Sequence, residues 1–156
     1  MTVLSRHSAW NAEQVDQFLS EFRAPIRLAA RTPTDDPMVC SLWFTYRDGE
    51  LYCATQQDAR IAQSLQADAR VAFEISPNEP PYFGVRGRGL ASISSEGAED
   101  TLGELIDRYL GEDDAGLATW LRSRVATEVV LTIRPEWLTA WDFRGRMAPS
   151  VSPSKP

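Results

Sequence analysis

Apolar residues recur at helical spacing near the start of the chain. Four large apolar side chains occupy positions i, i+3, i+4 and i+7 of one stretch, namely Val15, Phe18, Leu19 and Phe22. That spacing places them on one face of a helix that packs on a core. Asn11 with Gln14 three residues later has the pattern of a capping box, and Pro25 stops the helix at its other end. The pattern therefore predicts a first helix from about residue 11 to residue 22.

Much of the remaining chain alternates between apolar and polar residues or is rich in β-branched residues, as strands are. The predicted strands cover residues 26–31, 38–46, 50–55, 70–76, 82–94, 127–134 and 137–143. Asp48-Gly49 supplies the positive φ angles of a type I′ turn, which predicts a hairpin between the second and third of these strands. Pro135 is expected to separate the last two. Glycines at positions 84, 87 and 89 predict a bulge, a sharp bend or a close ligand approach.

Three further helices are expected, and 32–37 reads as a turn-rich loop. One helix covers 58–67 with Asp58 as its N-cap, a second carries an apolar stripe over 102–109, and a third starts after Asp114. The Leu-Trp-Phe run at 42–44 is apolar on both faces of its strand, which is typical of a closed barrel or of a wall covered by a second subunit. We find no repeat, so we expect one domain over residues 1–145 and a flexible tail over 146–156.

Composition narrows the class of protein. The chain has 156 residues and a formal net charge of -6, which argues against a general nucleic-acid binder because such a protein needs a basic face. No apolar run approaches a membrane span, and the N-terminus lacks a signal-peptide core, so we expect a cytoplasmic protein with no membrane partner. Cys40 and Cys53 fall on the two arms of the predicted hairpin. Free buried thiols are favoured over a disulfide, because directly paired antiparallel positions rarely suit disulfide geometry.

Two scarce residue types exclude several kinds of chemistry. The only histidine is His7, in an N-terminal segment expected to be loose, which argues against Ser-His-Asp or Cys-His catalysis, a zinc site and a histidine-ligated haem. The only lysine is Lys155, so no core lysine can form a Schiff base with pyridoxal phosphate. A phosphate would have to be held by arginine, hydroxyls and backbone amides. The helix that starts near Asp58, with Arg60 in its first turn, is such a place.

Taken in order, the chain's segments resemble a known family. They are PMVCSLWF, YRDGELYCAT, SLQADARVAFEI, PPYFGVRGRGLASI and RPEWLTAWDFRG. Over residues 24 to 145 they resemble the pyridoxamine 5′-phosphate oxidase-like family of flavin-binding split barrels. The resemblance implies an α+β, mainly β fold: a six-stranded antiparallel Greek-key split β-barrel. It also implies a homodimer that holds FMN, or a related deazaflavin, at the subunit interface.

The resemblance also assigns cofactor-binding residues. The ring would lie along the strand that contains Val39, Ser41, Leu42 and Trp43, and Trp141 occupies the place of an aromatic near the flavin, with core or dimer packing as its alternative role. The phosphate would meet Thr55, Gln56 and Arg60. The family's serine and lysine beside that arginine are replaced by Ala59 and Ile61. Arg86 or Arg88 would compensate if either turns inward, the alternative being a solvated barrel exterior.

The resemblance supports several functions. The first is an FMN-binding oxidoreductase in which the cofactor carries hydride chemistry on a substrate that the sequence does not name. The second is a split-barrel homodimer with a degenerate phosphate site, acting as a binding or structural protein. The third is a deazaflavin-dependent reductase. Vitamin B6 oxidation is not expected, because Arg144-Gly145-Arg146 lacks the histidine of the true oxidases.

Overall fold

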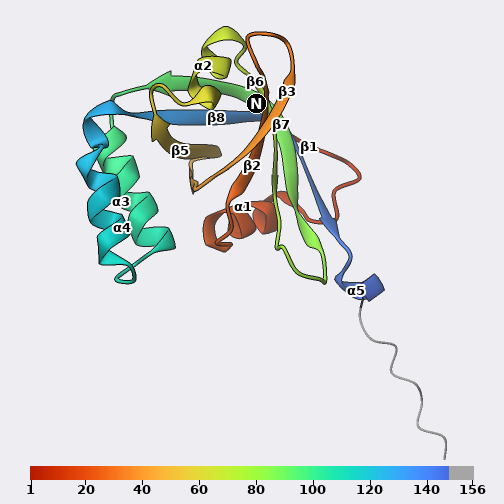
Figure 1. Cartoon of the computed structure of the whole chain (residues 1–156). Coiled ribbons are helices and arrows are strands. Elements are labelled where there is room, and N and C mark those ends of the chain that lie inside the picture. The colour runs from red at the N-terminus through yellow and green to blue at the C-terminus, as the bar shows by residue number, and fades with distance from the viewer. Residues whose placement is uncertain (148–156) are drawn as a thin grey trace, which may run out of the picture.

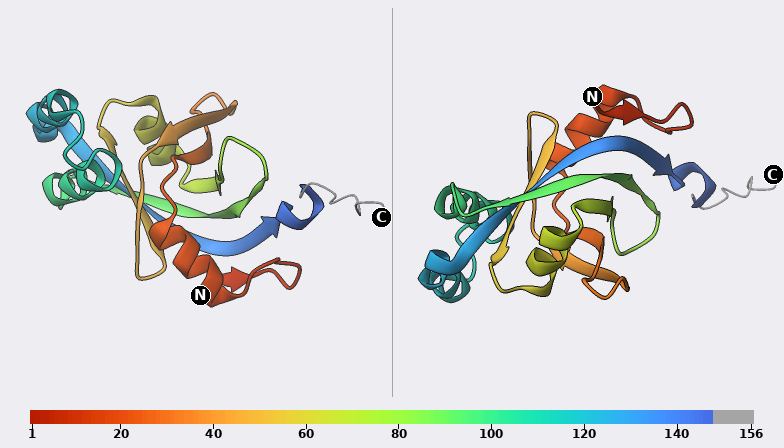
Figure 2. Two further views of the ribbon diagram at one scale, coloured as in Figure 1. Left: turned by 90° about the horizontal axis from the view of Figure 1, so that it is seen from below. Right: turned by 90° about the horizontal axis from the view of Figure 1, so that it is seen from above.

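A single curled β-sheet forms the body of the protein in the computed structural model, which describes residues 1–147 (Figures 1 and 2). Its strands are β1 (Val3–Leu4), β2 (Ile26–Arg31), β3 (Pro37–Leu42), β4 (Thr45–Arg47), β5 (Glu50–Gln56), β6 (Arg70–Ile75), β7 (Phe83–Ser94) and β8 (Glu128–Asp142). The helices are α1 (Ala12–Glu21), α2 (Arg60–Ala67), α3 (Ala98–Tyr109), α4 (Ala115–Ser123) and α5 (Arg144–Met147), with a 3₁₀ turn η1 (Val125–Thr127).

The strand order is β3-β2-β6-β7-β8-β5-β4, and every neighbouring pair in it is antiparallel. The described chain has eight strands where the resemblance implied six. One is added because 38–46 divides into β3 and β4, and the other is β1, which pairs in parallel with β8. Figure 1 shows α3 and α4 side by side at one end of β8 and α5 near its other end. Among residues 1–147, no helix is long and apolar enough to cross a membrane.

The predicted strand 38–46 is wrong in one respect, because it breaks at Trp43 and Phe44. Phe44 is fully buried, and its backbone N–H donates to the hydroxyl of Tyr109 at 3.2 Å instead of to a strand. That hydroxyl in turn donates to the carbonyl of Ala24 at 2.8 Å. A side chain from α3 therefore satisfies the backbone where the strand ends, as buried polar groups require.

The type I′ turn is confirmed, with φ of 52° at Asp48 and 79° at Gly49, but it joins β4 to β5. Strand β3 pairs with β2 instead. Cys40 therefore lies opposite Leu28 and Cys53 opposite Leu131, so the expectation that the cysteines share a hairpin is wrong. Both thiols are free, as predicted; Cys53 is buried and Cys40 is half-buried.

Strands β7 and β8 pair along almost their whole length, with one irregularity at Arg88 and Gly89. Gly89 lies opposite Pro135 and Arg88 opposite Trp137, so Glu136 is the extra residue of a β-bulge. Of the three alternatives that the glycines predicted, a bulge is present at Gly89, although its extra residue lies on the partner strand β8. The expected break at Pro135 is wrong, because a bulge is a place where a central strand tolerates a residue without an N–H.

The N-terminal segment is attached to the sheet, which corrects the expectation that it is loose. Val3 and Leu4 pair with β8, and the N–H of Ala9 donates to the carbonyl of Ala140 at 3.0 Å. The capping box of α1 is confirmed: the side chain of Asn11 accepts from the N–H of Gln14, and the Gln14 side chain accepts from the N–H of Asn11, each at 2.9 Å.

The other end of α1 is held by Arg108 of α3. Its guanidinium donates to the carbonyls of Ser20 at 2.6 Å, Phe22 at 2.9 Å and Leu19 at 3.3 Å. The last carbonyls of a helix have no partner within the helix, and a cation there also interacts favourably with the helix dipole. Arg108 therefore joins α1 to α3.

The C-terminal helices differ slightly from expectation. Asp114 caps α4 as predicted, since its carboxylate accepts from the N–H of Leu117 at 3.0 Å. Residues 144–147 form the short helix α5, which the sequence pattern does not predict. The predicted tail over 146–156 stays a prediction from residue 148 on, because those positions lie outside the described residues.

Candidate functional site

Strand β3 is one edge of the sheet, and one of its faces is open. Val39 is 69% exposed and Ser41 is exposed, whereas Met38, Cys40 and Leu42 are half-buried on the opposite face. Within residues 1–147, β3 pairs only with β2, so alternate backbone N–H and C=O groups along its outer edge have no strand partner. Such an edge can present donors and acceptors to a flat heterocycle.

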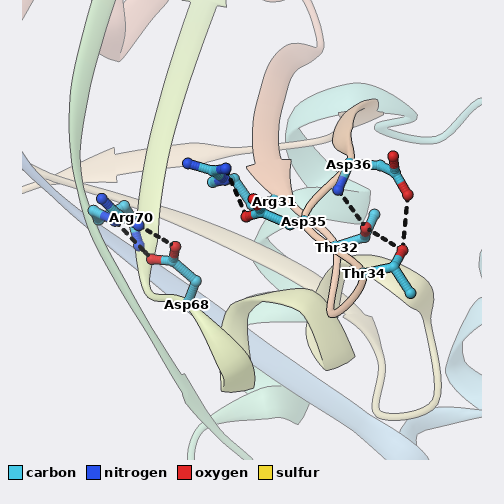
Figure 3. Close-up of polar contacts among 7 residues, drawn as sticks. All are labelled: Arg31, Thr32, Thr34, Asp35, Asp36, Asp68 and Arg70. Atoms are coloured by element: carbon cyan, nitrogen blue, oxygen red, sulfur yellow. Dashed lines mark hydrogen bonds and ion pairs between the residues drawn. The ribbon is translucent and has the colours of Figure 1, made fainter.

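The loop that leads into β3 is fixed by its own polar groups (Figure 3). The buried Thr32 hydroxyl accepts from the N–H of Asp36 at 3.1 Å, and the Thr34 hydroxyl donates to the Asp36 carboxylate at 2.8 Å. Asp35 adopts a φ of 68° and pairs with Arg31 at 2.6 Å. The predicted turn over 32–37 is thus confirmed, and it sets the position of β3.

The helix that follows β5 begins at Arg60, one residue later than an N-cap at Asp58 implies. Its N-cap is Ala59 in place of Asp58, and no side chain caps it. The N–H of Ala59 donates to the carbonyl of Gln56 at 3.0 Å, and the first bond of the helix runs from the N–H of Gln63 to the carbonyl of Ala59 at 3.1 Å. The N–H groups of residues 60 to 62 are therefore left for water or an anion.

Arg60 is exposed at the start of α2 and makes no ion pair with any residue from 1 to 147. Arg31 and Arg70 differ, because each is paired with an aspartate at 2.6 Å (Figure 3). The Arg70 guanidinium lowers the pKa of the Asp68 carboxyl to about 2. Of these three arginines, Arg60 is therefore the one whose charge is available to a ligand.

The structure changes the meaning of Ile61. Its side chain is 4% exposed and belongs to the core, so position 61 faces inward on α2. Isoleucine at this position packs in the core. The lysine of the resembling family is therefore replaced by a core residue, and this replacement does not put an apolar side chain on the exposed face at the start of α2. Ala59 is half-buried at the N-cap, which is a position where serine is strongly preferred.

Gln56 is tied to β8 and to the turn before it. Its amide donates to the carboxylate of Glu128 and, at 3.2 Å, to the carbonyl of Arg124. Its amide oxygen accepts from the Thr127 hydroxyl at 2.5 Å. The side chain of Gln56 is therefore engaged within the chain. Thr55 is half-buried opposite Val129.

A cavity of about 280 Å³ lies between β3 and the α3–α4 hairpin. It is lined by Ser41, Leu42, Trp43, Ala54, Leu102, Leu105, Leu117, Leu121 and Glu128. Sequence reasoning missed Glu128, whose only local signal was a single acid at the start of the apolar run EVVLTI. Burial raises the pKa of the Glu128 carboxyl, although the Gln56 hydrogen bond and the charge of Arg124 act in the opposite direction.

The two remaining predicted contacts lie elsewhere. Trp141 lines a second cavity of about 530 Å³ together with Arg86, and the guanidinium of Arg88 lies 5.2 Å from the ring centre of Trp137. Arg86 and Arg88 share an exposed face of β7, as the alternation of the strand predicts, while the glycines beside them are buried. Neither arginine turns inward, which corrects that alternative.

One chain cannot bring all nine predicted contacts to one ligand. Trp141 is 13 residues along β8 from Glu128, which corresponds to roughly 40 Å of strand at about 3.3 Å per residue. Strand β3 shares a cavity with Ala54 of β5, and its Met38 sulfur accepts from the Ser64 hydroxyl of α2 at 3.4 Å. Trp141 lies towards the other end of β8. The first cavity, at about 280 Å³, is also slightly smaller than the usual range of roughly 300–1,000 Å³ for ligand pockets.

Comparison with known proteins decides the fold. No protein-family model matches the sequence, and no curated protein is similar to it at a significant level. A solved structure of a conserved hypothetical protein from Mycobacterium tuberculosis aligns with a TM-score of 0.76 and 21% identity, covering 97% of this chain and 96% of that one. A protein named F420 reductase aligns at 0.67 and 22% identity over 79% of this chain and 94% of that one. The chain has the split-barrel fold of the pyridoxamine 5′-phosphate oxidase-like proteins.

A further split barrel is a putative pyridoxamine 5′-phosphate oxidase from Listeria innocua. It aligns with a TM-score of 0.62 and 20% identity, covering 82% of this chain and 95% of that one. At these identities the likeness concerns the fold. Within this split barrel, β3 and the β5–α2 turn keep the order that the sequence resemblance implied.

Proposed function

We propose that this split barrel binds FMN or a related deazaflavin and is an oxidoreductase. The observation that carries the proposal is the open edge of β3 near α2, whose start is uncapped and whose Arg60 has no ionic partner among residues 1–147. Two structurally similar proteins support the cofactor class, since one is named F420 reductase and another a putative pyridoxamine 5′-phosphate oxidase. The bound cofactor would supply hydride chemistry.

The chain's own groups suit the parts of such a cofactor. Arg60 and the free N–H groups of the first turn of α2 would hold the phosphate, with the Thr55 hydroxyl beside them. The open face of β3, with Val39 and Ser41, would lie against the ring system. Leu42 and Trp43 would contact it from the cavity side.

We propose that the protein acts as a homodimer. Val39 at 69% exposure and Leu90 at 44% exposure lie on outward faces of β3 and β7, and apolar side chains in such positions favour a partner surface. A second copy would also bring its own Trp141 to a cofactor that a single chain cannot bridge. A cytoplasmic location belongs to the same proposal and rests on the two free thiols.

One observation favours the alternative of a split barrel without a cofactor. Ala59 supplies no hydroxyl at the N-cap of α2, where the resembling family has serine. Because Ile61 faces the core, the loss amounts to one neutral hydrogen bond, worth about 0.5–1.5 kcal/mol or roughly 2- to 12-fold in affinity. A loss of this size weakens a phosphate site without abolishing it, so cofactor binding remains the favoured function.

Replacement of Arg60 tests the proposal. The dissociation constants of FMN and riboflavin are measured by fluorescence titration for the wild type and for Arg60→Ala. A charge-assisted hydrogen bond is worth about 1.5–3 kcal/mol, so FMN should bind roughly 10- to 150-fold more weakly to the variant. Riboflavin lacks the phosphate and should bind equally to both. The same pair of measurements is made with a phosphorylated deazaflavin and its dephosphorylated form.

Arg70→Ala is the matched control, because Arg70 is exposed near α2 but already paired with Asp68. It should leave the FMN affinity unchanged. Equal losses for FMN and riboflavin in Arg60→Ala would remove Arg60 from the phosphate site. Absence of binding by FMN and by the deazaflavin in the wild type would favour the alternative without a cofactor.

A further inference from the structure

The cavity under the α3–α4 hairpin has an unusual combination of walls. Leucines from both helices and from β3, together with Trp43 and Ala54, make most of its surface apolar. Glu128 is the one charged residue in the lining, and it is only 8% exposed. A single fixed carboxylate in an apolar cavity favours a ligand that has an apolar body and one cationic group.

Glu128 is held in place on one side only. Its Oε2 accepts a hydrogen bond from the Gln56 amide, whose orientation is set by the Arg124 carbonyl and the Thr127 hydroxyl. No residue from 1 to 147 donates a hydrogen bond to Oε1 or forms an ion pair with the carboxylate. The guanidinium of Arg124 instead lies 4.7 Å from the ring centre of Trp120.

This arrangement is incomplete if its role is only structural. The link between β5 and β8 would need no charge, because a glutamine at position 128 would accept the same hydrogen bond from Gln56. A carboxylate that is 8% exposed is costly unless it is paired and hydrogen-bonded. Here Oε1 accepts no hydrogen bond from residues 1–147 and is left to solvent, and the Arg124 charge acts on it only from beyond ion-pair distance. A cationic donor inside the cavity would supply both.

We propose that this cavity is a substrate subsite for a small organic ammonium ion. Its apolar body packs against the leucines, and its ammonium group donates to Glu128. The cavity has the liquid volume of roughly nine water molecules, which limits the ligand to on the order of ten non-hydrogen atoms. Ser41, Leu42 and Trp43 line this cavity and also belong to the strand assigned to the cofactor ring. The inference thus deepens the proposed function by naming a substrate class, and rests on it for the reaction but not for binding.

Calorimetric titration with 2-phenylethylamine tests the inference, with 2-phenylethanol as the uncharged ligand of the same shape. At pH 7.5 the wild type should bind the amine at least tenfold more tightly than the alcohol. Glu128→Gln keeps the shape and the acceptor for Gln56, and should reduce the preference to less than twofold. Glu136→Gln changes an exposed acid of the same strand outside the cavity, and should keep the wild-type preference.

Leu117→Trp is a second variant that does not alter the carboxylate. Its larger side chain fills the cavity and should weaken both ligands at least tenfold while circular dichroism shows the native fold. Equal affinities of amine and alcohol for the wild type would overturn the inference. A preference that survives in Glu128→Gln, or binding unaffected by Leu117→Trp, would also overturn it.

The same proteins separate this inference from the proposed function. Arg60→Ala should bind 2-phenylethylamine as the wild type does, because Arg60 is outside the cavity lining. Amine selectivity without FMN or deazaflavin binding would refute the cofactor proposal alone. Cofactor binding without amine selectivity would refute the ammonium subsite alone.

Discussion

Replacing Gly89 with alanine tests the bulge that joins the two longest strands. A Cβ atom at position 89 would lie 2.0 Å from the carbonyl oxygen of Arg134 and 2.9 Å from the Cα of Pro135. Both atoms belong to the backbone of β8, so no side-chain rotation can relieve the overlap. Overpacking a core typically costs about 1–3 kcal/mol, and a clash with paired backbone belongs at or above the upper end. We expect Gly89→Ala to lower the free energy of unfolding by about 3 kcal/mol.

Urea unfolding followed by circular dichroism measures this change. For a chain of this length the loss corresponds to a fall of roughly 6–12 °C in Tm. The control is Gly103→Ala within α3, where the nearest atom to a new Cβ is the Arg122 Nη1 at 3.6 Å. In that variant the free energy of unfolding should rise by about 0.5–1 kcal/mol, because alanine is the better helix residue. A Gly89→Ala protein within about 0.5 kcal/mol of the wild type, by the same assay, would refute the described approach of the two strands.

Three further predictions concern single side chains. Ala59→Ser should raise stability by about 0.5–2 kcal/mol through a new N-cap on α2, measured by urea unfolding; no gain would contradict the uncapped helix start. Arg108→Met should lower the free energy of unfolding by about 2–3 kcal/mol, because the last carbonyls of α1 lose their donor. A loss under about 0.5 kcal/mol would exclude this role of Arg108 in joining α1 to α3. The hydrogen bonds from Arg144 and Trp10 lower the pKa of the Asp142 carboxyl, so its stabilisation is present above about pH 4 and is lost as pH falls through the lowered pKa. Asp142→Asn should therefore cost about 1 kcal/mol at pH 7 and progressively less in acid; a difference independent of pH would contradict this.

The parts of the fold that were predictable depend on neighbouring residues. Asp48-Gly49 determines its turn through its own φ angles, and Asn11 with Gln14 caps its own helix. The glycines of β7 likewise indicated a bulge. For the turn and the cap, the residues that make the structure lie within a few positions of one another, so one stretch of sequence contains the whole cause. The glycines show only the β7 side of the bulge, because its extra residue lies on β8.

The expectations that the structure corrects depend on residues that are far apart in the sequence. The break at Phe44 needs the Tyr109 hydroxyl, 65 residues further along the chain. Pro135 is tolerated inside β8 because Gly89 lies opposite it on β7. The candidate site divides in the same way. The family resemblance assigned the ring to the residues of β3, and Arg60 was found from its place at a helix start, but the position of β3 at the sheet edge follows from its pairing with β2. Glu128 gains its role from Gln56, 72 residues away.

One titration tests whether this split barrel binds a flavin-type cofactor as a dimer. The purified wild-type protein is titrated into FMN and, separately, into a phosphorylated deazaflavin, with cofactor fluorescence and protein Tm recorded together with the mass in solution by light scattering. We expect saturable binding of at least one of them, one cofactor per chain, to a dimer whose Tm rises with ligand concentration. A monomer, or a protein that changes neither the fluorescence nor the Tm with either cofactor, would contradict it.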